Sequence, residues 1–199
     1  SSLGLYHFLR NQGHDVQVIT PTDFPDFLKW MPAAQDILIY PNEESKFAQR
    51  IANSTLIFTL DFNNLLRAKP LTPLLEQSGA DFVMIDHHQQ PDTYAKITYS
   101  DDKASSTCEL IYKTIVSLSS VEAINYEIAT CLYTGIMTDT GGFRYSLTSA
   151  ETHRIVATLL EKGADCTKIS SQVLDSYSID RLLLLGHVLN DLTYLEQYH

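Results

Sequence analysis

Short apolar runs alternate with segments of helical periodicity over the first half of the chain. The runs predict β-strands at residues 16–19, 37–40, 55–60 and 82–85. Apolar residues at helical spacing predict helices at residues 3–9, 43–53 and 73–78, the first of them ended by Gly13. Because this alternation is typical of parallel sheets, we expect an α/β fold in which helices flank a mostly parallel, twisted sheet.

The pattern changes in the second half of the chain. Residues 89–103 are mostly polar and predict a loop with an edge strand, whereas everything from Ser105 onward has a helical period. The helices expected in this C-terminal portion span residues 108–117, 122–138, 149–162, 165–174 and 179–196. We expect the leucine run at 182–185 to pack against the sheet or a neighbouring helix, with a homodimer interface as the alternative. No change in composition marks a second complete domain.

Polar residues directly follow two of the predicted strands. The run 82–85 ends in Asp86, His87 and His88, and the run 55–60 ends in Asp61. Parallel strands present such residues together at the carboxyl edge of the sheet, where α/β folds bind ligands. We expect Asp86 to orient an imidazole and not to bind the ligand itself, because side chains alternate along a strand.

A further carboxylate is predicted to point toward the same sheet. Asp139 continues the buried face of helix 122–138 and lies at the helix end, where the dipole disfavours an anion. Each residue has an alternative interpretation without a metal. Asp61 and Asp139 could each be an ordinary turn residue, and His87 and His88 could be one buried and one exposed histidine. Together they predict a metal site, and carboxylates with an imidazole suit manganese, magnesium or iron better than a thiolate-type zinc site.

The charge balance narrows the range of partners. The 199 residues carry a formal net charge of −10, which argues against binding to a long nucleic-acid duplex but not against short phosphorylated substrates. Cys108, Cys131 and Cys166 form no CxxC pair, which indicates reduced thiols and a cytoplasmic protein. No apolar run is long enough to span a bilayer, so we expect no membrane association.

Four segments resemble motifs of the DHH family of phosphoesterases. Asp86-His87-His88 resembles the signature that names the family, and Asp61 resembles its second motif. The segments 104–110 and 134–145 most resemble the branch of bifunctional oligoribonucleases (nano-RNases) that also dephosphorylate 3′-phosphoadenosine 5′-phosphate (pAp). The resemblance implies a DHH-type catalytic domain over residues 1–199.

The resemblance also implies residue roles and a reaction. Asp61 would bridge two Mn²⁺ ions (Mg²⁺ is the alternative), and His87 and Asp139 would complete the second metal site. His88 would lie near the scissile phosphate as a hydrogen-bond donor or general acid, supported by Asp86. Weaker candidates for substrate contact are Ser105, Ser106 and Arg144, the last with a solvated surface charge as the alternative. A water activated by two metals would hydrolyse short oligoribonucleotides or pAp.

Two parts of the family pattern have no counterpart in this sequence. The chain begins just after the first motif, which carries further metal ligands, and the family's C-terminal substrate-binding domain is absent. We therefore expect poor hydrolysis by these 199 residues alone. The alternatives are an inorganic pyrophosphatase or exopolyphosphatase-like hydrolase, and a nucleotide-binding module without turnover.

Overall fold

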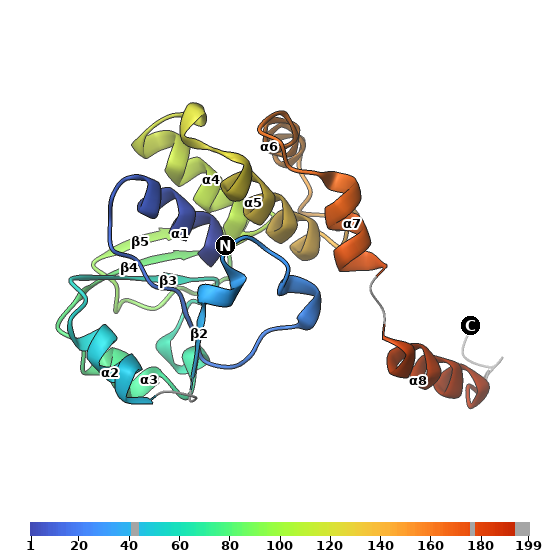
Figure 1. The fold of residues 1–199 in the computed structure, drawn as a ribbon, viewed down its shortest axis with the longest axis horizontal. Coiled ribbons are helices and arrows are strands. Elements are labelled where there is room, and N and C mark those ends of the chain that lie inside the picture. The colour runs from blue at the N-terminus through green and yellow to red at the C-terminus, as the bar shows by residue number, and fades with distance from the viewer. Residues whose placement is uncertain (41–43, 176–177, 194–199) are drawn as a thin grey trace.

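The computed structural model describes residues 1–40, 44–175 and 178–193. Its strands are interspersed with helices up to β5, and the elements after β5 are all helical (Figure 1). In chain order they are α1 (Ser2–Asn11), β1 (Ile19–Thr20), β2 (Leu38–Ile39), α2 (Glu44–Ala52), β3 (Leu56–Leu60), α3 (Thr72–Glu76), β4 (Asp81–Asp86), β5 (Ile97–Ser100), α4 (Thr107–Leu118), α5 (Tyr126–Asp139), α6 (Ala150–Glu161), α7 (Cys166–Leu174) and α8 (Ile179–Asn190).

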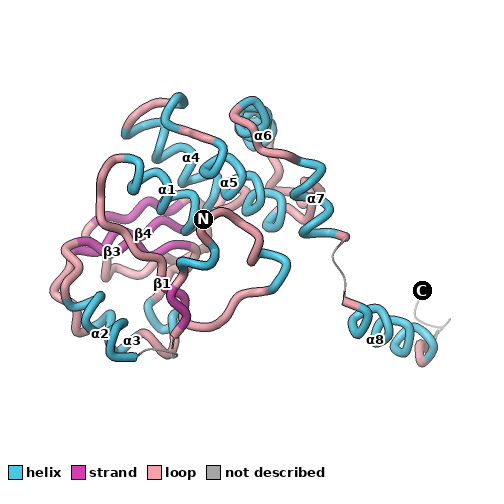
Figure 2. Tube along the Cα trace, in the orientation of Figure 1, coloured by secondary structure: helices cyan, strands magenta, loops and turns pink. Residues whose placement is uncertain are grey.

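All strand pairs in the described part of the chain are parallel. They form a two-stranded sheet, β1–β2, and a three-stranded sheet in the order β3–β4–β5 (Figure 2). In the larger sheet, Leu60 lies opposite Ile85, so β3 and β4 end side by side. The predicted α/β fold with parallel strands and a helical C-terminal portion is therefore confirmed.

Helices cover both sides of the larger sheet. Figure 1 shows α1, α4 and α5 on one side and the shorter α2 and α3 on the other. The main core lies between α4, α5 and the sheet, where Ile85, Leu110, Leu132 and Ile136 are almost completely buried. α1 packs against α5, and α6 and α7 pack outside it. This packing fixes the helix ends at the carboxyl edge of β3 and β4.

Most element boundaries lie close to the predicted ones, but two elements begin clearly later than the sequence predicted. The strand predicted at 16–19 is displaced, since β1 contains only Ile19 and Thr20, which pair with β2. The helix predicted from Glu122 begins at Tyr126, because the Asn125 side chain accepts a hydrogen bond from the N–H of Ile128 (3.1 Å) and caps the helix there. Residues 121–123 form a separate 3₁₀ turn.

The last described helix does not pack as the sequence predicted. None of the side chains of α8 is buried, and Leu183 and Leu184 are 67% and 63% exposed. Figure 1 shows α8 standing apart from the other elements. The expectation that the 182–185 run contacts the sheet or a neighbouring helix is therefore wrong, because periodicity defines a face but not what covers it. The helix predicted over 179–196 is also too long, because α8 ends at Asn190 and residues 191–193 are not helical; residues 194–196 lie outside the described part.

No helix in the described ranges is long and apolar enough to cross a membrane.

Candidate metal centre

Three potential metal ligands meet where β3 and β4 end. Asp61 directly follows β3, and His87 and His88 directly follow β4. Because these strands are parallel neighbours, their carboxyl ends bring residues that are distant in sequence together. One ligand atom from each of Asp61, His87 and His88 lies within 4.8 Å of the others. The grouping of strand-end residues that the sequence predicted is present in the structure.

The position of Asp61 is fixed by its backbone and by a neighbouring hydroxyl. Its φ angle is +71°, in the left-handed region that aspartate tolerates better than most residues. Its N–H donates to the carbonyl oxygen of Ile85 (3.2 Å), so the residue remains attached to β4 after β3 has ended. The hydroxyl of Thr107 donates to Asp61 Oδ1 (2.8 Å), and Oδ2 is left for another partner.

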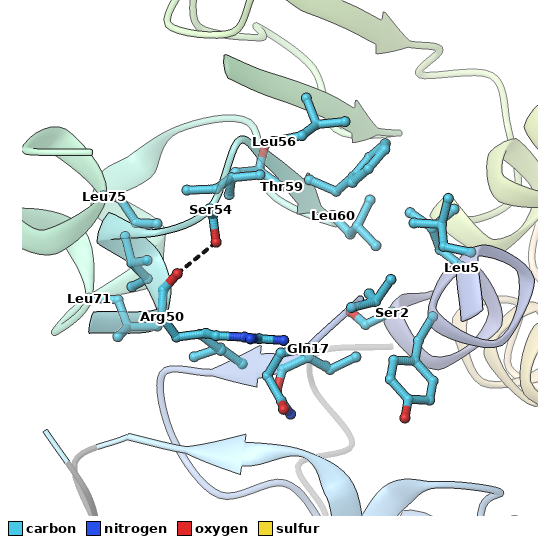
Figure 3. Close-up of a pocket in the computed structure, with 18 of the residues that line it drawn as sticks. Ser2, Leu5, Gln17, Arg50, Ser54, Leu56, Thr59, Leu60, Leu71 and Leu75 are labelled. Atoms are coloured by element: carbon cyan, nitrogen blue, oxygen red, sulfur yellow. Dashed lines mark hydrogen bonds between the residues drawn. The ribbon is translucent and has the colours of Figure 1, made fainter. Parts of the chain in front are cut away.

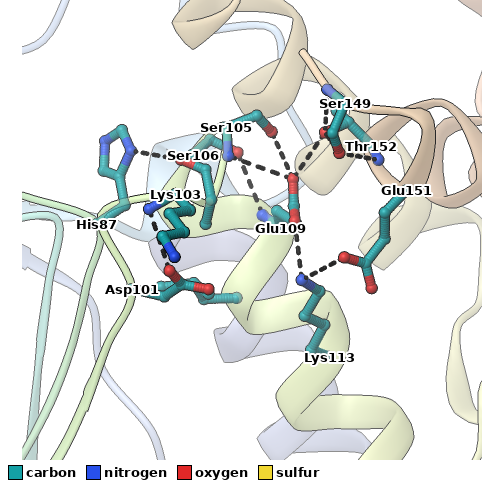
Figure 4. A network of polar contacts seen from close by, with 12 residues as sticks. His87, Asp101, Lys103, Ser105, Ser106, Glu109, Lys113, Ser149, Glu151 and Thr152 are labelled. Atoms are coloured by element: carbon teal, nitrogen blue, oxygen red, sulfur yellow. Dashed lines mark hydrogen bonds and ion pairs between the residues drawn. The ribbon is translucent and has the colours of Figure 1, made fainter. Parts of the chain in front are cut away.

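The ring orientation of His87 suits metal coordination. His87 Nδ1 lies 3.3 Å from the carbonyl oxygen of Ala104 (Figure 4). Since a carbonyl oxygen only accepts, Nδ1 carries the proton of this hydrogen bond. The neutral ring in this tautomer has its lone pair on Nε2, which lies 3.6 Å from Asp61 Oδ1. Metal-binding histidines in proteins are held in this way by a hydrogen bond through the second ring nitrogen.

His88 is oriented by the buried carboxylate of Asp86. Asp86 is 0% exposed, and its Oδ1 accepts a hydrogen bond from His88 Nδ1 (2.7 Å). Its Oδ2 accepts from the backbone N–H of His88 (3.1 Å). The two imidazoles therefore both present Nε2, and their ring centroids lie 4.8 Å apart. Asp86 thus contacts the ring of His88, and its role in orienting an imidazole for catalysis stays a prediction.

Asp139 ends α5 and lines the same cavity as Asp61, which has a volume of about 300 Å³. It does not belong to the close group of Asp61, His87 and His88 among the described residues. Burial raises the pKa of Asp139 to about 6, the negative charge of Asp61 adds to this effect, and the Ser1 amine and the two imidazoles oppose it. Its role as a metal ligand stays a prediction.

The three residues predicted to contact substrate have other partners in the structure. Ser105 is buried, and its hydroxyl donates to Glu109 Oε2 (2.6 Å). Ser106 is also buried, and its Oγ accepts from the N–H of Glu109 as the cap of α4. Arg144 is exposed, and its Nε donates to the carbonyl oxygen of Gly141 (2.6 Å). Substrate binding by these residues stays a prediction.

Sequence reasoning did not single out Glu109, which binds the segment next to the metal centre through Ser105. Its buried carboxylate accepts hydrogen bonds from Ser105, from Thr152 of α6 (2.9 Å) and from Lys113 (2.9 Å) (Figure 4). Burial acts to raise the pKa of Glu109, but these donors outweigh it and hold the pKa below its usual value. Through Glu109, the network connects the loop that contains Ala104 and Ser105 to Thr152 of α6.

A weak signal for Glu109 exists in the sequence. Ser106 and Glu109 have the spacing of a helix N-terminal capping pair, which would have predicted the start of α4 but not the link to Thr152. Thr107 was missed as well, because one hydroxyl at the beginning of a helix has no distinctive pattern.

The chemistry of this cluster fits a divalent cation. It combines the Asp61 carboxylate with two imidazoles that present Nε2, and the Asp139 carboxylate lines the same cavity as Asp61. Burial raises the pKa of Asp139 and the negative charge of Asp61 adds to this effect, so the charged form is disfavoured, and a nearby cation would offset that penalty. Oxygen and imidazole donors of this kind suit manganese, magnesium or iron.

Two relatives of this chain are named as bifunctional oligoribonucleases and PAP phosphatases. The chain is 28% identical over 173 residues to the bifunctional oligoribonuclease and PAP phosphatase NrnA of Thermus thermophilus, covering 87% of this chain and 48% of the relative. It is 34% identical over 115 residues to a probable enzyme of the same name from Streptococcus mutans, covering 58% of this chain and 36% of the relative. The chain thus spans about half or less of the length of these relatives.

A solved structure matches the whole chain. It is that of an exopolyphosphatase-related protein from Bacteroides fragilis, with a TM-score of 0.96 and 42% identity, covering 100% of this chain and 58% of the other. Residues 1–136 match the model of the DHH family, N-terminal domain. The resemblance seen in the strand-end motifs is thereby confirmed: this chain belongs to the DHH family.

Proposed function

We propose that this chain is the catalytic domain of a manganese-dependent phosphoesterase that hydrolyses short oligoribonucleotides, pAp or both. The observation that carries the proposal is the convergence of Asp61, His87 and His88 at the ends of two parallel strands, with both imidazoles presenting Nε2. The names of the relatives from Thermus thermophilus and Streptococcus mutans supply the substrate class.

The residues of the site divide into ligands and a proton donor. Asp61 has two carboxylate oxygens and would hold two cations, while His87 and Asp139 would each hold one. Divalent cations at this place would neutralise phosphoryl oxygens and lower the pKa of water. His88 lies beside this group and, when protonated, donates a hydrogen bond to a phosphate oxygen or a proton to the leaving group. Asp86 keeps the His88 ring in position for either task.

We further propose that the functional protein is longer than this chain. Asp61, His87 and Asp139, the ligands proposed among the described residues, are a small set for two ions. A first motif with additional ligands and a separate substrate-binding domain would complete the enzyme. The solved relative, of which this chain covers 58%, has room for such segments.

The test compares substrates in the longer natural protein and in the 199-residue chain. Phosphate or nucleotide release is measured with MnCl₂ or MgCl₂ from pAp, from RNA of two to five nucleotides and from pyrophosphate. We expect Mn²⁺-dependent cleavage of pAp and RNA by the longer protein and poor cleavage by the shorter chain. Cleavage of none of the three substrates by the longer protein would favour a nucleotide-binding module.

A second candidate is an inorganic pyrophosphatase or exopolyphosphatase-like hydrolase. The observation in its favour is that the whole of this chain matches 58% of an exopolyphosphatase-related protein. Rapid hydrolysis of pyrophosphate or polyphosphate, with little release from pAp or RNA, would identify this activity.

A further inference from the structure

The two loops that carry the close group of metal-site residues are bonded to each other. Residues 61–64 follow β3 and include Asp61, and residues 87–92 follow β4 and include His87 and His88. Each loop has one residue other than glycine in the left-handed region, Asp61 with φ +71° and Gln90 with φ +60°. Because this conformation costs free energy in residues with a Cβ, it persists only where the surrounding structure holds it.

Asn63 joins the two loops beside His88. Its Nδ2 donates a hydrogen bond to the carbonyl oxygen of Gln89 (2.6 Å) and lies 3.4 Å from the carbonyl oxygen of Gln90. Carbonyl oxygens only accept, so this place requires an NH₂ group, and an aspartate of the same shape could not make the bond. Since Gln89 directly follows His88, Asn63 fixes the backbone next to this histidine.

Two further hydrogen bonds connect the same loops. The N–H of Asp92 donates to the carbonyl oxygen of Asn63 (2.9 Å), and Asn64 Nδ2 donates to Asp92 Oδ2 (2.9 Å). The other carboxylate oxygen of Asp92 accepts from the N–H of Thr93 (2.7 Å). Asn63 is therefore bonded to the loop after β4 through its side chain and through its backbone.

Among the described residues, the end of β3 is positioned from the side of β4. β3 pairs with β4 only, and its other side borders a cavity of about 690 Å³ that also contacts residues 16–19 (Figure 3). Thr59 of β3, labelled in Figure 3, has its hydroxyl 2.6 Å from that of Tyr94, which lies farther along the loop after β4. This loop is thus anchored at Asn63, close to His88, and at Thr59, farther away.

The bonds from Asp86 to His88 do not relate this histidine to Asp61. They join Asp86 to the N–H and to Nδ1 of His88, so both stay within the segment that follows β4. The bond from Asn63 is different, because it connects the loop after β3 to the residue that follows His88. Asp86 therefore orients the ring, whereas Asn63 holds the backbone of His88 relative to the end of β3.

We propose that Asn63 is a positioning residue that sets the distance between His88 and Asp61. This inference rests on the proposed function, in which Asp61 binds the cations and His88 donates to the phosphate. Without the NH₂ group of Asn63, the proposed ligands keep their own partners, but His88 is free to move away from the phosphate. A displacement of about 1 Å is enough to slow a reaction substantially. Turnover should therefore depend on Asn63 more strongly than cation binding does.

The test is Asn63→Asp in the longer natural protein. The carboxylate has the shape of the amide but no N–H, and it would face the carbonyl oxygen of Gln89. We expect kcat on pAp or short RNA to fall by roughly 10–100-fold, as is typical of residues that orient a functional group, with KM and the affinity for Mn²⁺ little changed. The matched control is Asn53→Asp, the same change at an exposed residue after α2, which should keep the parent kcat.

Tyr94→Phe separates positioning of His88 from anchoring of the loop. It removes the bond to Thr59, which holds the same loop farther from His88. We expect a lower melting temperature and a kcat close to that of the parent protein. A fall in kcat as large as that of Asn63→Asp would overturn the proposal, because the whole loop and not Asn63 would then position His88.

The imidazole resonances of the metal-free longer protein test the proposal without any substrate. Asn63→Asp should shift those of His88 and leave those of the exposed His14 in place. This result stands even if neither pAp nor RNA is cleaved, so failure of the proposed function is distinguishable from failure of the positioning role. Unchanged His88 resonances, or a parent-like kcat in Asn63→Asp, would overturn the proposal.

A second variant serves if Asn63→Asp does not fold. Asp92→Ala changes an exposed residue and removes the bond from Asn64, which joins the same two loops. It should shift the His88 resonances in the same direction by a smaller amount. Resonances of His88 identical to those of the parent protein would count against the proposal.

Discussion

His87 Nε2 lies 3.6 Å from Asp61 Oδ1, although the two residues follow different strands. The rings and carboxylate of this site are positioned by protein groups alone: Ala104 holds His87, Asp86 holds His88 and Thr107 holds Asp61. A cation would therefore meet a site whose side chains are already oriented. Such preorganisation reduces the conformational entropy that is lost when the cation binds. Each residue can therefore be substituted separately to measure its own effect on binding or turnover.

Asp61→Asn should abolish metal binding. The amide has no charge and cannot bridge two cations. Loss of a residue that only hydrogen-bonds to a metal ligand typically lowers metal affinity by roughly 10–100-fold, and the loss of Mn²⁺ affinity here should be larger. The matched control is Asp81→Asn, at the amino end of β4, where the carboxylate is exposed and bound to Lys96. Isothermal titration calorimetry with MnCl₂ measures both. Equal affinities of the two variants would contradict the assignment of Asp61.

His88→Asn should reduce turnover and leave Mn²⁺ binding largely intact. The loss of a proton or hydrogen-bond donor at the phosphate should lower kcat by about 10²–10⁴-fold. The exposed His14 provides the control variant His14→Asn, which should keep full activity. Steady-state kinetics on pAp and calorimetry on the longer protein separate the two effects. A loss of Mn²⁺ binding would instead make His88 a ligand.

Glu109→Gln should destabilise the protein although Glu109 is not placed in the reaction. The neutral amide accepts hydrogen bonds less strongly and brings a buried NH₂ group without a partner, so the free energy of unfolding should fall by about 2–3 kcal/mol. The control is Glu151→Gln: Glu151 also binds Lys113 (3.0 Å) but is exposed, and its change should cost less than about 1 kcal/mol. Urea denaturation provides both values.

The same pair of variants tests the link from Glu109 to the site. Because Glu109 holds the loop that carries the Ala104 carbonyl, Glu109→Gln should also change the imidazole resonances of His87 in a two-dimensional NMR spectrum. Glu151→Gln should leave them in place. Unchanged His87 resonances in both variants would mean that the network stabilises the fold without positioning the ring.

Asp139 should make the metal-free protein less stable as the pH rises. Its pKa is about 6 in the folded state and near 4 when unfolded, so the folded protein binds the proton more tightly. Stability is therefore lost between about pH 4 and 6 as the folded carboxyl ionises, and the loss is complete above the folded pKa. Asp139 is surrounded by protein atoms at the cavity wall, but its side chain is still open to solvent, so screening keeps this effect below about 1 kcal/mol.

Asp139→Asn should remove this component of the pH dependence. Thermal unfolding in a metal chelator between pH 4 and 8 should show the variant more stable than the parent chain at pH 8 and similar to it at pH 4. Mn²⁺ should reverse the order at pH 8, because only the carboxylate binds the cation. A variant that is less stable than the parent chain at pH 8 without metal would refute the prediction.

Gly135→Ala should destabilise the contact between α5 and α4. A Cβ at Gly135 would overlap Cys108 Sγ, and overpacking of this kind costs about 1–3 kcal/mol. Gly186→Ala in α8 is the matched control, because its Cβ would meet no atom within 4 Å and should add up to about 1 kcal/mol of helix stability. In a Cys108→Ala background the cost at Gly135 should decrease, which a double-mutant cycle measures.

The sequence by itself determined the types of most elements and the residues that end them. Local periodicity and capping residues act over a few positions, so the strand 82–85 followed by Asp86, His87 and His88 was predicted correctly. Parallel pairing then followed from strand–helix alternation, and it placed Asp61 with His87 because the carboxyl ends of parallel strands share one edge. The start of α5 was misplaced, since the cap at Asn125 outweighed helical periodicity that extends further upstream.

Only the tertiary structure decided which groups hydrogen-bond to the site residues and which apolar surfaces remain exposed. The bond from Thr107 to Asp61 and the contacts of Glu109 with Ser105 and Thr152 join elements that are remote in sequence, and no local pattern encodes them. The same holds for the exposed leucines of α8 and for the cavity between β1 and β3. A periodic apolar pattern specifies that a face should be buried, but the partner that buries it depends on how the whole chain packs.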